Sequence, residues 1–297
     1  MSKLRVWGLE DFVTTKLGQP MFLVTPIIPT GAKMGLIFGR RGSGKSHLAF
    51  SLARAIADGE DFLGIYKTRQ GKVCYLSVDM PLPAVQERAG RLYHSMLHPE
   101  NVYMAVSDSP IDISKVRASD SWVRDINEFE PDLIIIDTLR KIHRMDEIDE
   151  QTVAVVHDSL ARLFGGDVAV CAVHHERKES ESNRTSPEEE RAAGSGAWLD
   201  NGDFGIRVLK DSRHRPARAR VSFPRIRYAE DQEPVQCEID TSCGCLMPVM
   251  TPASRAAQLA QRDPNIGQSD IAQVLMDEGL CQRAMAYRHA KRALGVE

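Results

Sequence analysis

A glycine-rich run near the start of this chain of 297 residues constrains its fold more than any other feature. Residues 39–46 read Gly-Arg-Arg-Gly-Ser-Gly-Lys-Ser, with an apolar run at 34–38 before them and an amphipathic run at 47–58 after them. The first flank predicts a short strand and the second predicts a helix. A strand, a glycine-rich turn ending in Lys-Ser and a helix, in that order, are typical of a phosphate-binding loop in an α/β fold.

The residue types of this loop suit contact with the phosphates of ATP or a close relative. Glycines allow backbone N–H groups to surround the β-phosphate, because they carry no Cβ. Lys45 can place its charge on the β- and γ-phosphates, the Ser46 hydroxyl can ligate Mg²⁺, and the helix dipole supports both. We therefore expect ATP and Mg²⁺ as cofactors, bound through Gly39, Arg40, Arg41, Gly42, Ser43, Gly44, Lys45, Ser46 and His47.

The sequence beyond this loop predicts a mostly parallel central sheet covered by helices on both faces. Continuous apolar runs alternate with amphipathic runs, as in α/β proteins with buried parallel strands. The expected helices lie at residues 83–97, 119–129 and 152–164, and the expected strands lie at residues 73–78, 101–106, 133–136 and 168–173. Two later strands, at 204–209 and 219–228, are expected at the far edge of the sheet.

Three of the predicted strands end in side chains that can act on a nucleotide. Asp137 follows four apolar residues, and we expect it to hold Mg²⁺ through water together with Ser46. Asp79 ends a strand expected beside that of Asp137, where it either positions the attacking water or caps the next helix. His175 ends a third strand, where it either senses the γ-phosphate or is satisfied by backbone groups.

The pattern of elements predicts four parts. Residues 1–32 form an N-terminal segment, 33–230 an α/β core, 231–251 a polar, cysteine-bearing linker, and 252–297 a small helical domain. Within the core, residues 176–197 are charged and rich in Ser and Gly, which predicts a loop. The N-terminal segment predicts a short amphipathic helix, which packs either on the core or on a neighbouring subunit.

The C-terminal part resembles a helix-turn-helix. Helices are expected at 254–261, from Gln268 onward, and at 282–294, with Ser269 as N-cap of the second and Gly279 in the turn after it. The third helix has a basic outer face suited to contact with duplex DNA, formed by Arg283, Arg288, Lys291 and Arg292. The alternative is a helical cap that docks on the core or binds a protein partner.

Composition excludes several classes of protein. The formal net charge of −3 gives no global basic field, so any contact with nucleic acid needs a local basic patch. No apolar run approaches the ~20 residues of a membrane span, and the first thirty residues lack the pattern of a signal peptide. Six cysteines without framework spacing indicate a reducing cytoplasm. We expect Cys237, Cys243 and Cys245 to be free thiols in a loop rather than a zinc site.

Taken together, the motifs resemble the RecA-like P-loop ATPases. The resemblance is closest to the plasmid-type replicative helicases called RepA and extends to the DnaB-like hexameric helicases. It covers residues 20–230 and rests on the phosphate-binding loop together with residues 75–79, 137–140, 173–175 and 193–197. The resemblance implies a ring, often of six subunits, with ATP bound between neighbours.

The resemblance also implies roles for individual residues. Lys45, Ser46 and Asp137 would lie at the phosphates and Mg²⁺, Asp79 would stand at the position of the catalytic glutamate, Arg88 would lie near the phosphates and His175 would be the sensor. Asp79 is one methylene shorter than the glutamate of the family. Relatives place an arginine finger from the neighbouring subunit near residues 200–203, where this chain has no arginine. The candidates for that finger are Lys210, Arg213 and Arg215, and the alternative is a solvated basic turn.

Two segments are candidates for contact with single-stranded DNA. In RecA-like proteins, the chain after the Asp137 strand and after the His175 strand faces the central channel or filament axis. Here these segments carry Lys141, His143 and Arg144, then Arg177 and Lys178. The second segment also holds several glutamates, so a solvated loop is the alternative.

We therefore expect an ATPase that acts as a ring-forming DNA motor, specifically a replicative DNA helicase of a plasmid, phage or mobile element. Its expected partners are single-stranded DNA, duplex DNA through the C-terminal domain, and further copies of itself in a hexamer. Two other functions stay open. One is a RecA-like factor that coats or anneals single strands, and the other is an ATP-switched regulator that binds DNA.

Overall fold

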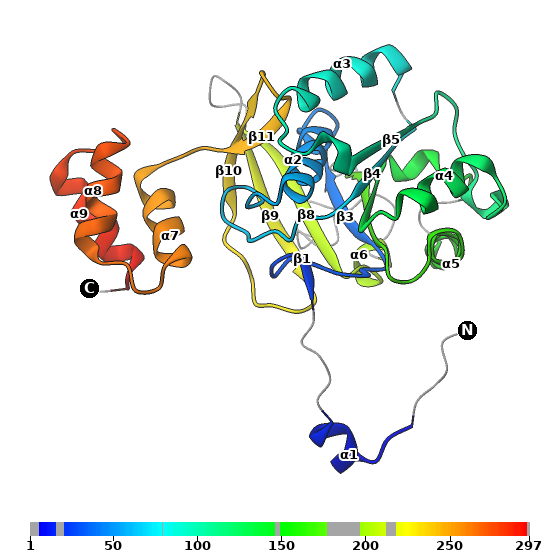
Figure 1. Cartoon of the computed structure of the whole chain (residues 1–297), viewed down its shortest axis with the longest axis horizontal. Coiled ribbons are helices and arrows are strands. Elements are labelled where there is room, and N and C mark those ends of the chain that lie inside the picture. Colours follow the sequence, from blue (N-terminus) through cyan, green and yellow to red (C-terminus); the bar gives the residue numbers. More distant parts are fainter. Residues whose placement is uncertain are drawn as a thin grey trace, which may run out of the picture.

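The computed structural model describes residues 6–15, 21–78, 80–145, 149–176, 197–211 and 218–295. Within them, the expected α/β class is confirmed by a nine-stranded sheet in the order β11-β10-β9-β8-β3-β7-β6-β4-β5 (Figure 1). A further two-stranded sheet pairs β1 with β2. The predicted helices and strands of the core are present, with small shifts of their ends.

The centre of the large sheet is parallel, as its continuous apolar strands predict. Its parallel strands are β3 (Gly35–Gly39), β4 (Val73–Ser77), β5 (Val102–Val106), β6 (Leu133–Asp137), β7 (Ala169–His175) and β8 (Phe204–Asp211). Antiparallel pairing extends the sheet beyond β8 through β9 (Arg218–Ile226), β10 (Val235–Asp240) and β11 (Cys245–Pro248). The parallel strands therefore end at one common edge, where ligands of open α/β sheets bind.

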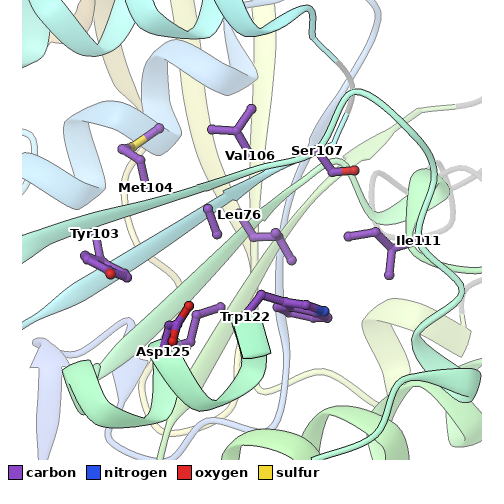
Figure 2. A pocket seen from close by; sticks show the side chains of 10 residues that line it. Leu76, Tyr103, Met104, Val106, Ser107, Ile111, Trp122 and Asp125 are labelled. Atoms are coloured by element: carbon purple, nitrogen blue, oxygen red, sulfur yellow. The ribbon is translucent and has the colours of Figure 1, made fainter. Parts of the chain in front are cut away.

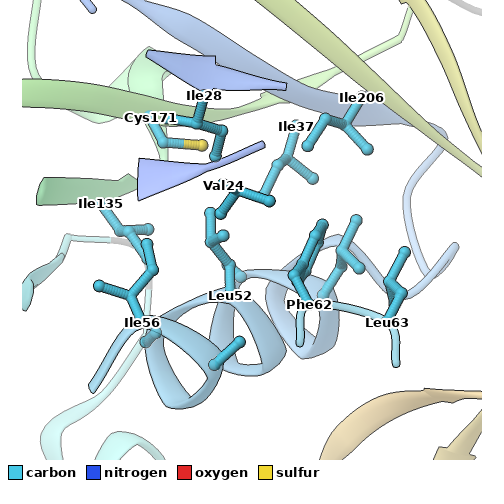
Figure 3. Packing of buried hydrophobic residues seen from close by; sticks show 14 of the residues in the cluster. Val24, Ile28, Ile37, Leu52, Ile56, Phe62, Leu63, Ile135, Cys171 and Ile206 are labelled. Atoms are coloured by element: carbon cyan, nitrogen blue, oxygen red, sulfur yellow. The ribbon is translucent and has the colours of Figure 1, made fainter. Parts of the chain in front are cut away.

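Helices cover the sheet on both faces. The first face packs against α2 (Lys45–Asp58) and α3 (Leu82–Tyr93). Figure 3 shows Leu52 and Ile56 of α2 directed toward Ile37 and Ile135 of the sheet. The second face packs against α4 (Ser121–Phe129), α5 (Glu150–Phe164) and α6 (Ala197–Asp200). Single 3₁₀ turns lie at η1 (Pro99–Asn101), η2 (Ile113–Lys115) and η3 (Leu139–Lys141).

The N-terminal segment 1–32 is not separate from the core. The strands β1 (Phe22–Val24) and β2 (Ile28–Pro29) form a hairpin whose apolar side chains are buried in the same cluster as α2. The short helix α1 (Leu9–Thr14) is present as expected, but none of its residues is buried. Alternation of apolar and proline residues hid the hairpin from the sequence analysis, because each strand is too short to show a period.

Residues 231–251 are not the irregular linker that the sequence predicted. They contain β10 and β11, which continue the large sheet. Their inward side chains, which include Cys237 and Cys245, belong to the main core, while the side chains between them face solvent. This alternation is that of a half-buried antiparallel strand, and its polar residues made the segment read as a loop. The cysteines therefore lie in the core and not in a loop, and burial raises the pKa of Cys237 to about 12.

The C-terminal residues form three helices near the β10 and β11 end of the sheet (Figure 1). They are α7 (Pro252–Arg262), α8 (Gln268–Asp277) and α9 (Arg283–Ala293), and they share a hydrophobic cluster of their own. Among the described residues, no helix combines the length and the apolar character needed to cross a bilayer.

Candidate nucleotide-binding site

The glycine-rich loop connects β3 to α2, as the sequence predicts. Gly39 ends β3, and a Cβ on this residue would lie 2.3 Å from the Val208 carbonyl oxygen of the neighbouring strand. Gly44 precedes α2 with a φ of +105°, a conformation that side chains with a Cβ rarely adopt. The loop is therefore built on positions that only glycine fills without strain, and its N–H groups precede the positive end of α2.

Lys45 lies inside this loop and is 6 % exposed. Its Nζ donates hydrogen bonds of 2.9 Å to the carbonyl oxygens of Gly39 and Arg40. The same Nζ lies 3.2 Å from Nδ1 of His175, at the end of β7. Because a lysine ammonium can only donate, Nδ1 accepts in this contact, and the His175 ring is the neutral tautomer that carries its proton on Nε2.

The loop fits a phosphate ligand by a second observation. The Ser43 hydroxyl is buried, with the residue 5 % exposed, and within the described part of the chain its oxygen has no hydrogen-bond partner. A buried hydroxyl without a partner is costly unless a ligand or water satisfies it. Ser46, in the first turn of α2, is half-buried, where its hydroxyl can reach a cation at the loop. These residues therefore suit a nucleotide and Mg²⁺.

Asp137 ends β6 and is 8 % exposed. The buried Tyr75 hydroxyl donates a 2.7 Å hydrogen bond to its Oδ2. The Tyr75 ring stacks on Phe50 of α2, with ring centres 4.6 Å apart. The pKa of Tyr75 is raised well above its ordinary value, first by burial and then by the Asp137 carboxylate, while Arg88 opposes the shift. Tyr75 therefore stays a neutral donor and orients the carboxylate.

Sequence analysis missed the role of Tyr75, although a signal was present. A tyrosine inside an otherwise apolar buried strand needs a partner for its hydroxyl, and the strand expected beside it carries Asp137. The pairing of β4 with β6 is confirmed, with Ser77 opposite Asp137. Arg88, on α3, is half-buried and close enough to act on the Tyr75 hydroxyl, which agrees with its expected place near the phosphates.

The end of β7 divides its side chains between the two faces of the sheet. His175 contacts Lys45 on the α2 face, whereas His174 packs against Trp198 of α6 on the other face, with ring centres 6.2 Å apart. The Glu176 N–H then donates a 3.0 Å hydrogen bond to the Gly39 carbonyl. The end of β7 is thereby fixed to the start of the phosphate-binding loop.

Comparison with known proteins agrees with this geometry. Residues 6–181, more than half of the chain, match a family model described as an AAA domain. The chain belongs to this family. Its AAA domain carries the loop, the Asp137 strand and the His175 strand described above.

Solved structures show which fold the AAA domain has. The ATPase domain of a helicase matches with a TM-score of 0.54 and 14 % identity, over 74 % of this chain and 86 % of that one. The flagellar accessory protein FlaH from Methanocaldococcus jannaschii matches with a TM-score of 0.52 and 13 % identity, over 75 % and 92 %. A KaiC-like protein from Pyrococcus horikoshii OT3 matches at 0.50 and 13 %, over 76 % and 94 %. The resemblance to RecA-like P-loop ATPases is therefore confirmed at the level of the fold.

The AAA domain contains a buried ion pair that the sequence analysis did not predict. The Arg207 guanidinium of β8 donates to the Glu176 carboxylate, and both side chains are 3 % exposed. The only sequence signal was a single arginine in the otherwise apolar stretch of β8. Because Glu176 also bonds to Gly39, this pair lies directly behind the phosphate-binding loop.

Three histidines of the AAA domain surround Trp198, which is fully buried. The centres of the His143, His157 and His174 rings lie 5.9, 6.4 and 6.2 Å from that of Trp198. His143 is 2 % exposed, so the expectation that it contacts DNA is wrong. Burial, and then the charge of Lys33, lower the pKa of His157.

The strand β11 supports the first turns of α2 from the side. The Ser51 hydroxyl accepts from the Leu246 N–H at 2.8 Å and donates to the Leu246 carbonyl at 2.9 Å. His47 Nδ1 lies 2.6 Å from the Gly244 carbonyl in the turn between β10 and β11. Its ring therefore bonds to this turn, although the sequence placed His47 among the nucleotide contacts.

The other predicted site residues are only partly covered. Arg40, Arg41, Arg144 and Lys210 are exposed, and Lys141 is half-buried. Their roles toward phosphate, DNA or a neighbouring subunit stay predictions. The remaining candidates lie outside the described residues, and they are Asp79, Arg177, Lys178, Arg213 and Arg215.

A separate cavity of about 440 Å³ lies between β5 and α4 (Figure 2). Its walls include Tyr103, Val106 and Trp122. The strands β4, β6 and β7 separate β5 from β3, so this cavity is not part of the candidate nucleotide site.

Proposed function

We propose that this protein is an ATP-hydrolysing, ring-forming DNA motor, specifically a replicative DNA helicase of a plasmid, phage or mobile element that works in the cytoplasm. The contact between Lys45 and His175 carries the proposal. A motor needs a side chain that registers the γ-phosphate and passes the change to a DNA-contacting segment. His175 touches the phosphate-binding lysine and precedes residues 177–196, which contain the candidate DNA contacts Arg177 and Lys178.

The residues of the site have separate tasks in this proposal. Lys45 exchanges its two carbonyl contacts for the β- and γ-phosphate oxygens of ATP. Ser46 and Asp137 hold Mg²⁺, directly and through water, and the bound cation supplies charge neutralisation between the phosphates. Tyr75 keeps the Asp137 carboxylate oriented. His175, released from Lys45, can donate its Nε2 proton to the γ-phosphate and thereby sense its presence.

The DNA and oligomer parts of the proposal rest on fewer observations. Arg144 is exposed and Lys141 is half-buried after the Asp137 strand, where they can contact phosphates of a single strand. Lys210 is exposed at the end of β8, as a finger that reaches a neighbouring subunit requires. A hexameric ring with ATP at the subunit interfaces would bring these groups together.

The first test measures ATP hydrolysis with and without single-stranded DNA, and compares the wild type with Lys45→Ala and the matched control Lys67→Ala. Lys67 is an exposed lysine outside the site. We expect DNA to stimulate turnover, and Lys45→Ala to lower it about 10²–10³-fold, since a phosphate-stabilising donor is removed. Turnover that survives in Lys45→Ala would overturn the ATPase proposal. A wild type that stays monomeric with ATP and DNA would overturn the ring.

A second candidate function is an ATP-switched DNA-binding regulator, and the exposed basic residues of α9 favour it. The same assay separates the two, because Lys45-dependent turnover that is indifferent to single-stranded DNA supports the regulator. Strand unwinding then distinguishes a helicase from a factor that only coats or anneals single strands.

A further inference from the structure

The three C-terminal helices have a core that is distinct from that of the AAA domain. Ile271, Ala272 and Leu275 of α8 pack against Ala286 and Ala290 of α9, and all five side chains are fully buried. Alanines at the contact allow the two helices to approach closely, while the larger apolar residues fill the space beside them. The faces of α8 and α9 that do not take part in this core are thereby fixed in orientation.

The turn between α8 and α9 is also fixed. The N–H of Leu280 donates to the Leu275 carbonyl at 3.0 Å, and the N–H of Gly279 donates to the Met276 carbonyl at 2.9 Å. Gly279 has a φ of +68°. This pattern is a Schellman motif, which satisfies the last carbonyls of α8 and turns the chain sharply toward α9. Helix, tight turn and helix therefore follow each other as in a helix-turn-helix.

The outer face of α9 is basic. Arg288, Lys291 and Arg292 are exposed at spacings of three and four residues, so they form one stripe along the helix. Arg283 is exposed at the start of the helix, and Met285, which is 47 % exposed, lies beside the stripe. The chain contains no aspartate or glutamate from Gly279 to the end of α9.

Acidic residues of α7 and α8 do not neutralise this stripe through any described ion pair. Glu278 forms its ion pair with Arg255 of α7, with the two atoms 2.5 Å apart. Asp270 accepts from the Gly267 N–H at the start of α8, and Asp277 accepts from Gln273. In a chain of net charge −3, α9 thus carries a local positive field that suits a polyanion.

We propose that α9 is a recognition helix that binds the major groove of duplex DNA, at a site separate from the nucleotide site. Its eleven residues span about 16 Å, and the major groove of B-form DNA, about 12 Å wide, admits one helix. Arg288, Lys291 and Arg292 contact phosphates and base edges, and Met285 supplies an apolar contact for thymine methyl groups. The site is independent of the proposed motor function.

Duplex DNA fits this surface better than the other nucleic acids do. Single strands are held by exposed aromatic platforms, whereas Tyr287 of α9 is partly buried against the helical core. The major groove of duplex RNA is too deep and narrow for side chains to read. A convex basic helix therefore matches duplex DNA.

The test measures binding of the full-length protein to a labelled DNA duplex by fluorescence anisotropy, without nucleotide. The variant Arg288→Gln/Lys291→Gln/Arg292→Gln removes the stripe and keeps good helix formers on exposed positions. The matched control Lys67→Gln/Arg117→Gln/Arg124→Gln removes three exposed positive charges elsewhere. Since duplex binding is measured without ATP, its result does not depend on whether the protein is a motor.

We expect the stripe variant to lose about 10²-fold in duplex affinity at about 0.1 M salt, because each lost phosphate contact accounts for nearly one decade there. The slope of log affinity against log salt should fall by about 2.7, while the control keeps both values. A salt titration of the wild type alone checks the same term if the variant melts early.

Three results would overturn the proposal. The stripe variant could bind duplex as the wild type does. The wild type could bind duplex no better than the background of an unrelated acidic protein, which would favour a helical cap that docks on a protein. The stripe variant could lose single-strand and duplex binding in equal proportion, which would make α9 a general polyanion surface.

Discussion

Removing one oxygen atom from Tyr75 tests whether the Asp137 carboxylate is held in place for a cation. In Tyr75→Phe the ring keeps its stacking on Phe50, so no cavity forms and the change is confined to the hydrogen bond. The lost bond is 2.7 Å long, buried, and made to a carboxylate. Hydrogen bonds to charged groups contribute about 1.5–3 kcal/mol, so the free energy of unfolding should fall by that amount.

The same substitution should weaken the interaction with Mg²⁺. A partner that orients a metal-ligating carboxylate typically changes metal affinity 10–100-fold when it is removed, so ATP hydrolysis should need about 10–100 times more Mg²⁺ for half-saturation. Because the pKa of Tyr75 is raised well above its ordinary value, the phenol remains protonated and the effect should not vary across neutral pH.

The assay is a Mg²⁺ titration of ATP hydrolysis together with urea unfolding, with Tyr66→Phe as the control. Tyr66 is also a buried core tyrosine, but it packs edge-on against Phe223, away from Asp137. The reasoning is refuted if Tyr75→Phe needs the same Mg²⁺ concentration as the wild type. It is also refuted if Tyr66→Phe shifts the Mg²⁺ requirement by as much as Tyr75→Phe does.

Two further predictions concern the second face of the sheet. Arg207→Met leaves Glu176 as a buried charge without its cation and should lower the free energy of unfolding by about 3–5 kcal/mol, whereas Arg207→Met/Glu176→Leu should recover most of the loss; a double variant as unstable as the single one in urea would contradict this. The lowered pKa of His157 means that the unfolded chain binds its proton more tightly, so this histidine should reduce stability as the pH falls below 6.5 toward the folded pKa. Urea unfolding of His157→Gln across pH 5–8 should show a smaller loss on the acid side, and an unchanged pH profile would count against the assignment.

The features that the sequence predicted well are those coded over a few neighbouring residues. The loop 39–46 needs only its own glycines, lysine and serine, and the flanking periodicity identifies the strand and helix that position it. Asp137 was predicted equally well, because four apolar residues mark a buried strand and the acidic side chain marks its end. Parallel strands then bring such ends to one edge, whatever the order of the sheet.

The features that the sequence analysis missed depend on contacts between distant residues. Tyr75 and Asp137 are 62 residues apart and meet only because β4 pairs with β6. Arg207 and Glu176 come together across the end of β3, and no local pattern pairs one charge with the other. In both cases the residue type signals that a buried partner is needed, but only the sheet order supplies that partner.

The failed prediction of a linker changes how the C-terminal helices are connected to the nucleotide site. A polar linker would have separated α9 from the AAA domain, but residues 231–251 contain two strands of the large sheet, and α7 begins soon after β11 ends. The strand β11 is bonded through Leu246 to Ser51 of α2, two turns after Lys45. The three helices are therefore attached to a strand that packs on the phosphate-binding helix itself, so α9 and the nucleotide site are joined through regular, hydrogen-bonded structure rather than through a flexible connector.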